Sequence, residues 1–513
     1  MPASPDHDAV AGPASPGSRV DSVSQPPSSP RKVIPITPIA AGDSGNSSDV
    51  VSLYQAERKI YARSIRGWFS HWRWAMVWIT QLVFYGLPWL SMNDRQAMLF
   101  DLAARRFYIF NLVLYPQDLI YLTGLLVVSA LSLFLFTAVA GRLWCGYACP
   151  QTVYTEIFMW VERRIEGDRV ARMRLDKSPM GAVKLARKSA KHAVWIAIGL
   201  WTGFTFVGYF TPIRELASEV ISASLGRWEL FWVLFYGFAT YGNAGWMREQ
   251  VCKYVCPYAR FQSAMFDHDT LVVTYDAARG EGRGLRPRSD TPAQYRAKGL
   301  GDCIDCGFCV QVCPTGIDIR NGLQYECISC SACIDACNSV MDKMRYPRGL
   351  IRNSTPNGIS LKLSPAAMLR RVFRPRVLVY TAVLWMVIAG LIWSLFSRDS
   401  FRVDVVRDRG TMARVVGHGQ IENVYRLQIM NAAERSRHYR IDVAGIEGAR
   451  IVPEADVTIE AAGARWIPVR VQVPPDAAPP GSHPIRFVIE AQADGGTSVH
   501  EQVVEKSVFL VPR

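Results

Sequence analysis

The chain has 513 residues, half of them hydrophobic, and its 58 Lys and Arg against 44 Asp and Glu give a formal net charge of +14. This length exceeds the size at which one hydrophobic core keeps growing, which excludes a single globular domain. The basic residues lie beside long apolar runs, so the excess charge favours an anionic membrane surface and argues against a nucleic-acid partner.

The first 60 residues are rich in Ser, Pro, Gly and Asp and show no periodic apolar pattern. Such a segment cannot bury enough apolar surface to offset the chain entropy lost on folding. We therefore expect residues 1–60 to form a disordered cytoplasmic tail, and we expect no cleavable signal peptide.

Five apolar runs follow, each close to the twenty residues that a helix needs to cross the hydrocarbon layer. They cover residues 74–90, 118–140, 192–210, 228–245 and 377–396. The first run is short, and without it the N-terminus would lie on the other side of the membrane. The sequence predicts a four-helix transmembrane region over 61–260 and a fifth transmembrane helix over 376–398.

The orientation follows from the distribution of Lys and Arg. Eleven of them lie between Arg142 and Lys191, whereas the loop after the third run has only Arg214 and Arg227. Because cytoplasmic loops carry the basic excess, this predicts the orientation of a multi-pass membrane protein. The N-terminus and residues 246–375 should lie on the cytoplasmic side, and the chain after Arg398 outside.

A cysteine motif follows the second apolar run and recurs after the fourth. The two copies are Cys145-Gly-Tyr-Ala-Cys149-Pro150 and Cys252-Lys-Tyr-Val-Cys256-Pro257, both C-x-Y-x-C-P. A spacing of i, i+4 places two thiols on one side of a helix, although the following proline weakens that expectation. The repetition indicates an internal repeat whose four thiols converge at the inner membrane face.

Thiolates are soft ligands that select Cu(I), zinc or an iron–sulfur centre. A metal or redox role is the hypothesis for Cys145, Cys149, Cys252 and Cys256, and the alternative is that they are small buried hydrophobic residues. Tyr147 and Tyr254 recur with them, and aromatic residues at a membrane interface are usually anchors.

Two weaker signals surround these motifs. His268 could ligate a metal, but a lone histidine is more often structural. Glu156, Glu162 and Glu166 follow the first motif at helical spacing, mixed with arginine, which indicates a solvated helix face.

The remaining eight cysteines form two runs of C-x2-C-x2-C-x3-C between Cys303 and Cys337. In such a pair, three close thiolates and the distant fourth cysteine of the other run hold each [4Fe–4S] cluster. This assigns Cys303, Cys306, Cys309 and Cys337 to one cluster, and Cys313, Cys327, Cys330 and Cys333 to the other. Zinc is the alternative, but it needs two C-x2-C pairs rather than two four-cysteine runs.

Residues 261–375 should thus be an α+β two-cluster ferredoxin domain. In this domain Asn338 replaces the proline expected after the last cysteine.

The last part of the chain, residues 399–513, alternates polar and apolar residues. Candidate strands cover 424–430, 440–445, 455–461, 466–473, 483–491 and 503–511, separated by Gly, Pro and Asp. Several short strands at near-regular spacing predict an all-β sandwich of immunoglobulin type. No cysteine lies after Cys337, so this domain is built without disulfides.

The combination of paired C-x-Y-x-C-P motifs, a two-cluster segment, one more apolar run and an immunoglobulin-like tail resembles the cytochrome c oxidase accessory proteins of the CcoG/FixG/RdxA type. The resemblance covers residues 60–513. It implies a multi-pass polyferredoxin of the bacterial inner membrane with a periplasmic C-terminal domain. It also implies that the protein reduces Cu(II) to Cu(I) for assembly of cbb3-type oxidases, with the four membrane-face cysteines as the copper and redox site. Two other functions stay open: an electron relay to quinone or a partner enzyme, and a non-catalytic assembly scaffold.

The resemblance also implies partners. These are the membrane, a cytoplasmic electron donor, and a copper chaperone or oxidase assembly factors, with a homodimer as one option. Two [4Fe–4S] clusters are the expected cofactors, and copper is the expected substrate ion.

The charge distribution makes a testable prediction about topology. Reporter fusions that end at about Arg352 and at Arg513 should give opposite signals, because the run at 377–396 should carry the chain across the membrane. Fusions with compartment-specific reporters in living cells measure this. Matching signals at both positions would mean that this run does not cross.

Overall fold

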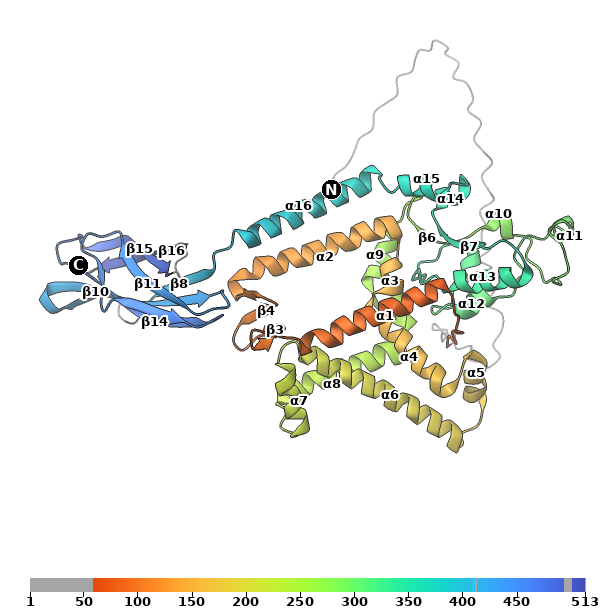
Figure 1. Ribbon diagram of the computed structural model, residues 1–513, viewed down its shortest axis with the longest axis horizontal. Coiled ribbons are helices and arrows are strands. Elements are labelled where there is room, and N and C mark those ends of the chain that lie inside the picture. Colours follow the sequence, from red (N-terminus) through yellow and green to blue (C-terminus); the bar gives the residue numbers. More distant parts are fainter. Residues whose placement is uncertain (1–58, 409, 411–412, 493–500, 513) are drawn as a thin grey trace, which may run out of the picture. The chain divides into compact units, whose positions relative to one another are not determined.

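The computed structural model describes residues 59–408, 410, 413–492 and 501–512. The predicted disordered tail therefore lies almost entirely outside the described residues. Five long helices occupy the predicted apolar runs (Figure 1): α1 (Trp68–Gly86), α2 (Leu119–Ala140), α6 (Ala182–Val207), α8 (Arg227–Tyr241) and α16 (Pro375–Phe396). By length and composition, two described helical segments could cross a membrane, Pro116–Ala140 and Pro375–Phe396. The other three spans stay predictions.

The helix bounds differ from the predicted runs where charged residues extend a helix. α6 starts at Ala182, well before the predicted 192–210, and its first turns carry Lys184, Arg187 and Lys188. Lys and Arg are good helix formers, so the helix continues beyond the part that hydropathy detects. α8 ends at Tyr241 and passes into a π-helical turn over Gly242–Met247.

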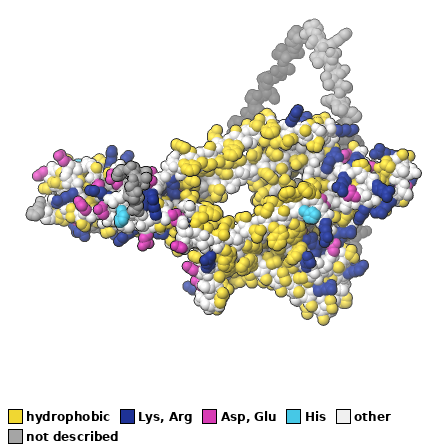
Figure 2. Space-filling model, in the orientation of Figure 1, with side chains coloured by type: hydrophobic (Ala, Val, Ile, Leu, Met, Phe, Trp, Pro, Cys, Tyr) yellow, Lys and Arg dark blue, Asp and Glu magenta, His cyan; other side chains and the backbone are white. Residues whose placement is uncertain are grey.

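α2 and α16 lie side by side (Figure 1). The Tyr121 hydroxyl donates a hydrogen bond to the Ser394 carbonyl at 3.1 Å. A Cβ atom on Gly124 would lie 2.3 Å from Leu391 Cδ2, so glycine allows the two helices to come close. Figure 2 shows hydrophobic side chains over this helical part of the molecule, and many of them are exposed, including Leu122, Leu126, Val379, Trp385 and Met386. An exposed apolar flank of this kind suits contact with lipid.

α6 and α8 form a second close pair. A Cβ atom on Gly203 would lie 2.2 Å from the Val233 carbonyl oxygen, and one on Gly199 would lie 2.7 Å from that of Gly237. Small residues at a helix contact let backbones approach, which is the usual way that helices associate where no hydrophobic driving force exists.

The segment between α2 and α6 forms α3 (Leu143–Tyr147), α4 (Pro150–Glu166) and α5 (Arg169–Lys177). Glu156, Glu162 and Glu166 on α4 are buried, with exposed fractions of 6%, 1% and 1%. The prediction of a solvated face was therefore wrong. Helical spacing showed that the acids share a face, but the cations that cover this face come partly from distant segments of the chain.

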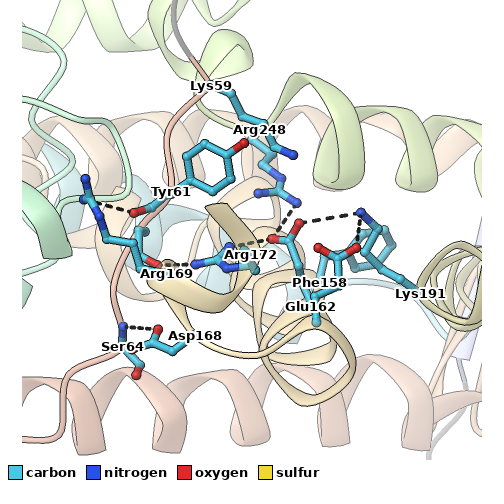
Figure 3. A network of polar contacts seen from close by, with 12 residues as sticks. Lys59, Tyr61, Ser64, Phe158, Glu162, Asp168, Arg169, Arg172, Lys191 and Arg248 are labelled. Carbon is cyan, nitrogen blue, oxygen red and sulfur yellow. Dashed lines mark hydrogen bonds and ion pairs between the residues drawn. The ribbon is translucent and has the colours of Figure 1, made fainter. Parts of the chain in front are cut away.

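Each of the three carboxylates meets buried cations. Figure 3 shows Glu162 between Arg172, Arg248 and Lys191, at 2.8, 3.1 and 3.7 Å. Glu156 lies 2.6 Å from Arg73 of α1, and Glu166 lies 2.9 Å from Lys191 of α6. Burial opposes ionisation of Glu162, yet Arg248, Arg172 and Lys191 hold its pKa below the usual value. These ion pairs connect α4 to α1, α5, α6 and the segment before Cys252.

The cysteine-rich part starts after α9 (Pro257–Met265) with β6 (Val272–Tyr275), which pairs antiparallel with β7 (Ile351–Ser354). Between these strands lie α12 (Phe308–Val312) and α13 (Ala332–Met344), each starting inside a cysteine run. The shorter helices of this part are α10 (Ala277–Gly280), α11 (Pro292–Ala297), η5 (Ile319–Asn321), α14 (Pro356–Ser360) and α15 (Pro365–Arg370). Its core contains Tyr295, Ile334, Met341 and Leu350 together with buried cysteines.

The C-terminal part is the predicted β-sandwich, and this prediction is confirmed. One sheet has the order β12 (Arg450–Ile451), β14 (Ala464–Val473), β10 (Gln420–Asn431), β8 (Phe401–Arg407), with β9 (Arg414–Val416) also on β10. The other has the order β13 (Ala455–Ile459), β11 (Arg437–Ala444), β15 (Gly481–Ala491), β16 (Glu501–Val511). Apolar residues of both sheets, among them Phe401, Tyr425 and Phe487, form the core between them.

A segment that the sequence did not predict joins α1 to α2. It contains β1 (Ser91–Met92), β2 (Arg95–Gln96), β3 (Met98–Asp101), β4 (Arg106–Ile109), β5 (Leu112–Leu114) and η2 (Pro116–Asp118). The Tyr115 hydroxyl donates to the Asn431 carbonyl at 2.9 Å. Buried Asp118 pairs with Arg398 at 2.6 Å and with Arg402 at 2.7 Å. These contacts attach the start of the β-sandwich to the segment that precedes α2. α7 (Ile213–Ile221) lies between α6 and α8 in the chain.

The buried ion pairs predict that Glu162→Gln lowers stability strongly. Removing one partner of a buried pair leaves its cations uncompensated, which costs about 3–5 kcal/mol. Because the pKa of Glu162 is depressed, its contribution is present above the unfolded-state value of 4.5 and is lost as the pH falls. Thermal unfolding in detergent at pH 7 and at lower pH measures both effects.

Glu215→Gln is the matched control, because Glu215 on α7 is exposed and forms no ion pair with a described residue. Equal melting temperatures for the two variants would contradict the structural role of Glu162.

Candidate metal centres

The eight cysteines between Cys303 and Cys337 gather around two cavities. Cys303, Cys306, Cys309 and Cys337 line the first, with Phe308, Met341 and Ile351 among the apolar side chains. Cys313, Cys327, Cys330 and Cys333 line the second, with Val273 and Ile328, and Cys309 also borders it. In each cavity, three cysteines of one run thus meet the last cysteine of the other, which is the arrangement that the crossed pattern of a two-cluster ferredoxin predicts.

Both cysteine loops have the same unusual backbone. Asp305 and Gly307 in the first run have positive φ values of 53° and 62°. Ser329 and Ser331, at the same places in the second run, have φ values of 53° and 58°. Left-handed residues turn successive backbone N–H groups to one side and create a concavity that suits an anionic group. The repeated conformation explains how two short loops can present their thiols in the same way.

The residue after each run decides how the following helix ends. Pro314 follows Cys313, and α12 stops at Val312 with Cys313 in an extended conformation. Asn338 replaces that proline after Cys337, so α13 continues to Met344. The Asn338 side chain accepts a hydrogen bond from the Gly349 N–H at 3.0 Å. The departure from the ferredoxin pattern therefore lengthens this helix and anchors the turn before β7.

The chemistry of the donors fits an iron–sulfur cluster in each cavity. Burial raises the pKa of Cys327 and of Cys337 to about 12, and that of Cys309 to about 11. Such thiols stay protonated until a positively charged centre displaces the proton. Four thiols among apolar side chains match the soft ligand set of a cluster. Cys306 is the one exposed member of the eight, so the first cavity lies closer to solvent.

The two membrane-face motifs share a broken-helix geometry. Cys145 lies in α3, but Cys149 is extended, with φ −61° and ψ 127°, and starts α4. Cys252 lies in a π-helical turn (η4, Val251–Val255), and Cys256 is extended before α9. The expectation that each pair shares one helix was wrong, because the residue before a proline is driven out of the helical region. The matching geometry nevertheless repeats from one motif to the other.

The four membrane-face thiols influence one another. Burial raises the pKa of Cys145 to about 12, with further contributions from Cys149 and Cys252. The pKa of Cys252 is raised to about 11 by burial and then by Cys149 and Cys256. Cys145 and Cys252 both pack against the cluster that contains Ile328 and Cys330, so the two motifs are neighbours. Among the described residues, however, no three His, Cys, Asp or Glu side chains are grouped closely enough for one metal ion.

A buried arginine beside the thiols was missed as a site residue. Arg142 is 2% exposed, and its positive charge lies near Cys145, Cys252 and Cys256. Its Nη1 donates to the Tyr325 carbonyl, whereas its Nε and Nη2 have no hydrogen-bond partner. Sequence reasoning counted Arg142 only as a topology signal. Its position directly before the first motif was the clue available in the sequence.

The first motif packs directly on the loop that carries Cys327 and Cys330. A Cβ atom on Gly146 would lie 2.7 Å from the Ile328 oxygen and 2.9 Å from the Cys330 nitrogen. The Tyr147 hydroxyl hydrogen-bonds with Ser331, and Arg142 reaches the Cys327 carbonyl at 3.5 Å. Tyr254 of the second motif is exposed instead, so the two tyrosines are not equivalent. His268 is exposed as well, and its backbone carbonyl accepts from Asn357 at 3.0 Å.

Comparison with known protein families places iron–sulfur domains on these segments. Residues 247–356 match a family described as a 4Fe-4S dicluster domain, and residues 122–167 match a 4Fe-4S binding domain. Residues 391–512 match a family described as an IG-like fold at the C-terminal of FixG. The matches therefore cover both cysteine regions and the β-sandwich.

Full-length relatives are also found. The chain is 39% identical to the nitrogen fixation protein FixG of Rhizobium meliloti, over 90% of this chain and 94% of that protein. It is 39% identical to protein RdxA of Cereibacter sphaeroides, over 84% of this chain and 92% of that protein. A crystal structure of a FixG-related protein from Vibrio parahaemolyticus covers 22% of this chain, with 23% identity and a TM-score of 0.20.

The cavity geometry predicts that Cys337→Ser and Cys333→Ser affect different clusters. Cys337→Ser should remove the cluster beside Cys303 and leave most of the other, so that iron falls from about eight to about four per chain. Cys333→Ser should remove the cluster beside Cys327. Iron analysis of anaerobically purified protein and electron paramagnetic resonance of the remaining cluster measure this.

Identical spectra for the cluster left in the two variants would contradict the crossed arrangement. Asn338→Ser serves as the control, because it changes the residue next to Cys337 without removing a thiol.

Proposed function

This chain belongs to the FixG/RdxA family of membrane-associated iron–sulfur electron-transfer proteins, and from this premise we propose that it reduces Cu(II) to Cu(I) for the assembly of a cbb3-type cytochrome c oxidase. The observation that carries the proposal is the packing of the Cys145 motif on the loop of Cys330. It brings a soft thiol site next to one of the two cavities that suit a cluster.

We assign the cluster ligands by the cavities that they line. Cys303, Cys306, Cys309 and Cys337 would hold one [4Fe–4S] cluster, and Cys313, Cys327, Cys330 and Cys333 the other. When bound, these clusters supply one-electron redox chemistry at a potential that the surrounding charges and hydrogen bonds tune. The set with exposed Cys306 faces the side from which a cytoplasmic donor could approach, and the other set adjoins the membrane-face thiols.

The four membrane-face cysteines are the proposed copper and redox site. Sulfur ligands stabilise Cu(I) over Cu(II), so binding at Cys145, Cys149, Cys252 and Cys256 favours the reduction itself. Each Cu(II) takes up one electron, which originates from the cytoplasmic donor, and leaves as Cu(I). The charge of Arg142 opposes the effect of burial on the pKa of Cys145 and of Cys252, and two of its nitrogen atoms have no hydrogen-bond partner.

The proposed setting is the bacterial inner membrane. α1, α2, α6, α8 and α16 would cross it, with the cysteine-rich domain in the cytoplasm and the β-sandwich in the periplasm. Two features support this: α2 and α16 have the length and apolarity of spans, and basic residues crowd the segment after α2. A copper chaperone or an oxidase assembly factor would receive Cu(I), and the chain could act as a homodimer.

A second candidate for the membrane-face site is a further iron–sulfur centre. It is favoured by the match of residues 122–167, which contain Cys145 and Cys149, to a 4Fe-4S binding domain. In that case the chain would be an electron relay to quinone or to a partner enzyme. The two candidates differ in the expected iron content of the protein. They also differ in whether loss of the four thiols abolishes Cu(II) reduction.

Replacing Cys145 and Cys149, or Cys252 and Cys256, by Ser should abolish Cu(II) reduction without removing the clusters. The reason is that a complete set of eight ligands exists without these four residues. Mixing the reduced, anaerobically purified protein with Cu(II) and a Cu(I)-specific chelator measures the rate, and iron analysis measures the clusters.

Each double variant should keep about eight iron atoms per chain. Its rate of Cu(II) reduction should fall by roughly 90% or more, because two soft ligands have been removed. Tyr254→Phe is the control, because the exposed Tyr254 lies in the same motif without a thiol. Undiminished reduction in both double variants would overturn the copper site, and loss of about four iron atoms would favour the third cluster.

A further inference from the structure

A large groove runs along α1, with lining residues from Ala62 to Gly86 on this part of the chain. It has a volume of about 1640 Å³ and is lined by residues of α1, α4, α6, α12 and α13 and by the segment before α1. Pockets for small ligands and cofactors usually measure about 300–1,000 Å³, so this groove suits a larger molecule. Nothing in the proposed copper chemistry uses it.

The part of the groove between α1 and α6 is apolar and rich in tryptophan. Its walls include Trp74, Trp78, Trp160 and Trp201, together with Val77, Leu82, Val194 and Ile198. Trp78, Trp160 and Trp201 are 62%, 42% and 47% exposed, so their rings are open to whatever fills the groove. Tryptophan prefers the boundary between hydrocarbon and lipid headgroups.

The part next to the cysteine-rich domain is basic. The lining carries seven Lys and Arg against the two carboxylates of Glu156 and Asp168. Some of this charge is already neutralised, because Arg73 and Arg163 pair with Glu156, and Arg172 pairs with Glu162. Asp168 accepts a hydrogen bond from the Ser64 N–H at 3.1 Å.

Four cations of the groove remain without a carboxylate among the described residues: Arg63, Arg66, Arg164 and Lys343. All four are exposed. The Arg63 guanidinium lies over the Phe308 ring at 4.7 Å, and that of Arg164 lies over Trp160 at 5.3 Å. Stacking on groove-lining rings keeps these two charges at the groove rather than in open solvent.

We propose that this groove binds one anionic phospholipid, whose phosphate headgroup contacts Arg63, Arg66, Arg164 and Lys343 and whose acyl chains lie against the tryptophans of α1, α4 and α6. Unpaired cations at one end and exposed apolar rings at the other match the two ends of such a lipid. A quinone has an uncharged headgroup and would leave the four cations without a partner.

The bound lipid would connect the helices to the cysteine-rich domain. The basic end of the groove is lined by Pro314 and Ala332, which are neighbours of Cys313 and Cys333, and by Phe308 between Cys306 and Cys309. The headgroup would therefore bridge α1 and α4 to both cysteine loops. The inference rests on the proposed position of α1 and α6 in the membrane, but it does not depend on copper reduction.

Native mass spectrometry of the iron-loaded protein in a neutral detergent tests the site. The protein is stripped of lipid and then offered equal amounts of phosphatidylglycerol and phosphatidylcholine with the same acyl chains. The wild type should keep one phosphatidylglycerol with at least a tenfold preference. Changing Arg63, Arg66, Arg164 and Lys343 to Gln should abolish that preference, since each cation near an anionic lipid is worth about fivefold in binding.

The matched control changes four exposed cations outside the groove, Lys177, Arg187, Arg288 and Arg370, to Gln and should behave as the wild type. A second variant, with Lys in place of Arg63, Arg66 and Arg164, should retain the lipid, which separates loss of charge from misfolding. Unchanged lipid binding in the Gln variant, equal binding of both lipids by the wild type, or one quinone per chain with no retained phospholipid would overturn the proposal.

Discussion

A carboxylate that is buried away from water stays ionised only where cations and hydrogen-bond donors replace the lost water, and three such carboxylates on α4 organise the helical part of this protein. Glu156 reaches α1, Glu162 reaches α5 and Arg248, and Glu166 reaches α6. α4 begins at Pro150, directly after Cys149, and Arg248 precedes Cys252 by one turn. The Glu162–Arg248 pair therefore joins the helix that follows the first thiol motif to the segment that precedes the second.

A second constraint acts on the cysteine-rich domain. Its two loops use left-handed residues at matching places, and each cavity takes one thiol from the other loop. Strands β6 and β7 pair antiparallel and so join the two ends of this domain. Gly146 lies against Cys330 with no room for a side chain, and this contact couples the domain to the membrane-face motif. These contacts determine the order of the sites. The cysteine set with exposed Cys306 comes first, the set with Cys330 comes next, and the thiols that follow α2 come last.

The β-sandwich is attached by a different kind of contact. Buried Asp118 at the start of α2 pairs with Arg398, which lies between α16 and β8, and with Arg402, which lies in β8. Because α2 and α16 pack along their length, one carboxylate ties both helix ends and the first strand together. Tyr115, which follows the short strands between α1 and α2, adds a hydrogen bond to the Asn431 carbonyl.

Local patterns determined much of this protein. The spacing of cysteines identified the two cluster loops and the two thiol motifs, the apolar runs located α2 and α16, and the alternating residues predicted the sandwich. These features depend on neighbours in the chain, so the sequence alone was enough.

The sequence alone was not enough for Glu156, Glu162 and Glu166, whose partners include Arg73, Lys191 and Arg248 far along the chain. The same holds for Arg142, for the packing of Gly146 on Cys330, and for the basic groove along α1. Only the tertiary structure decided these, because burial and charge pairing arise where distant segments meet, and no period or spacing in the sequence records that meeting.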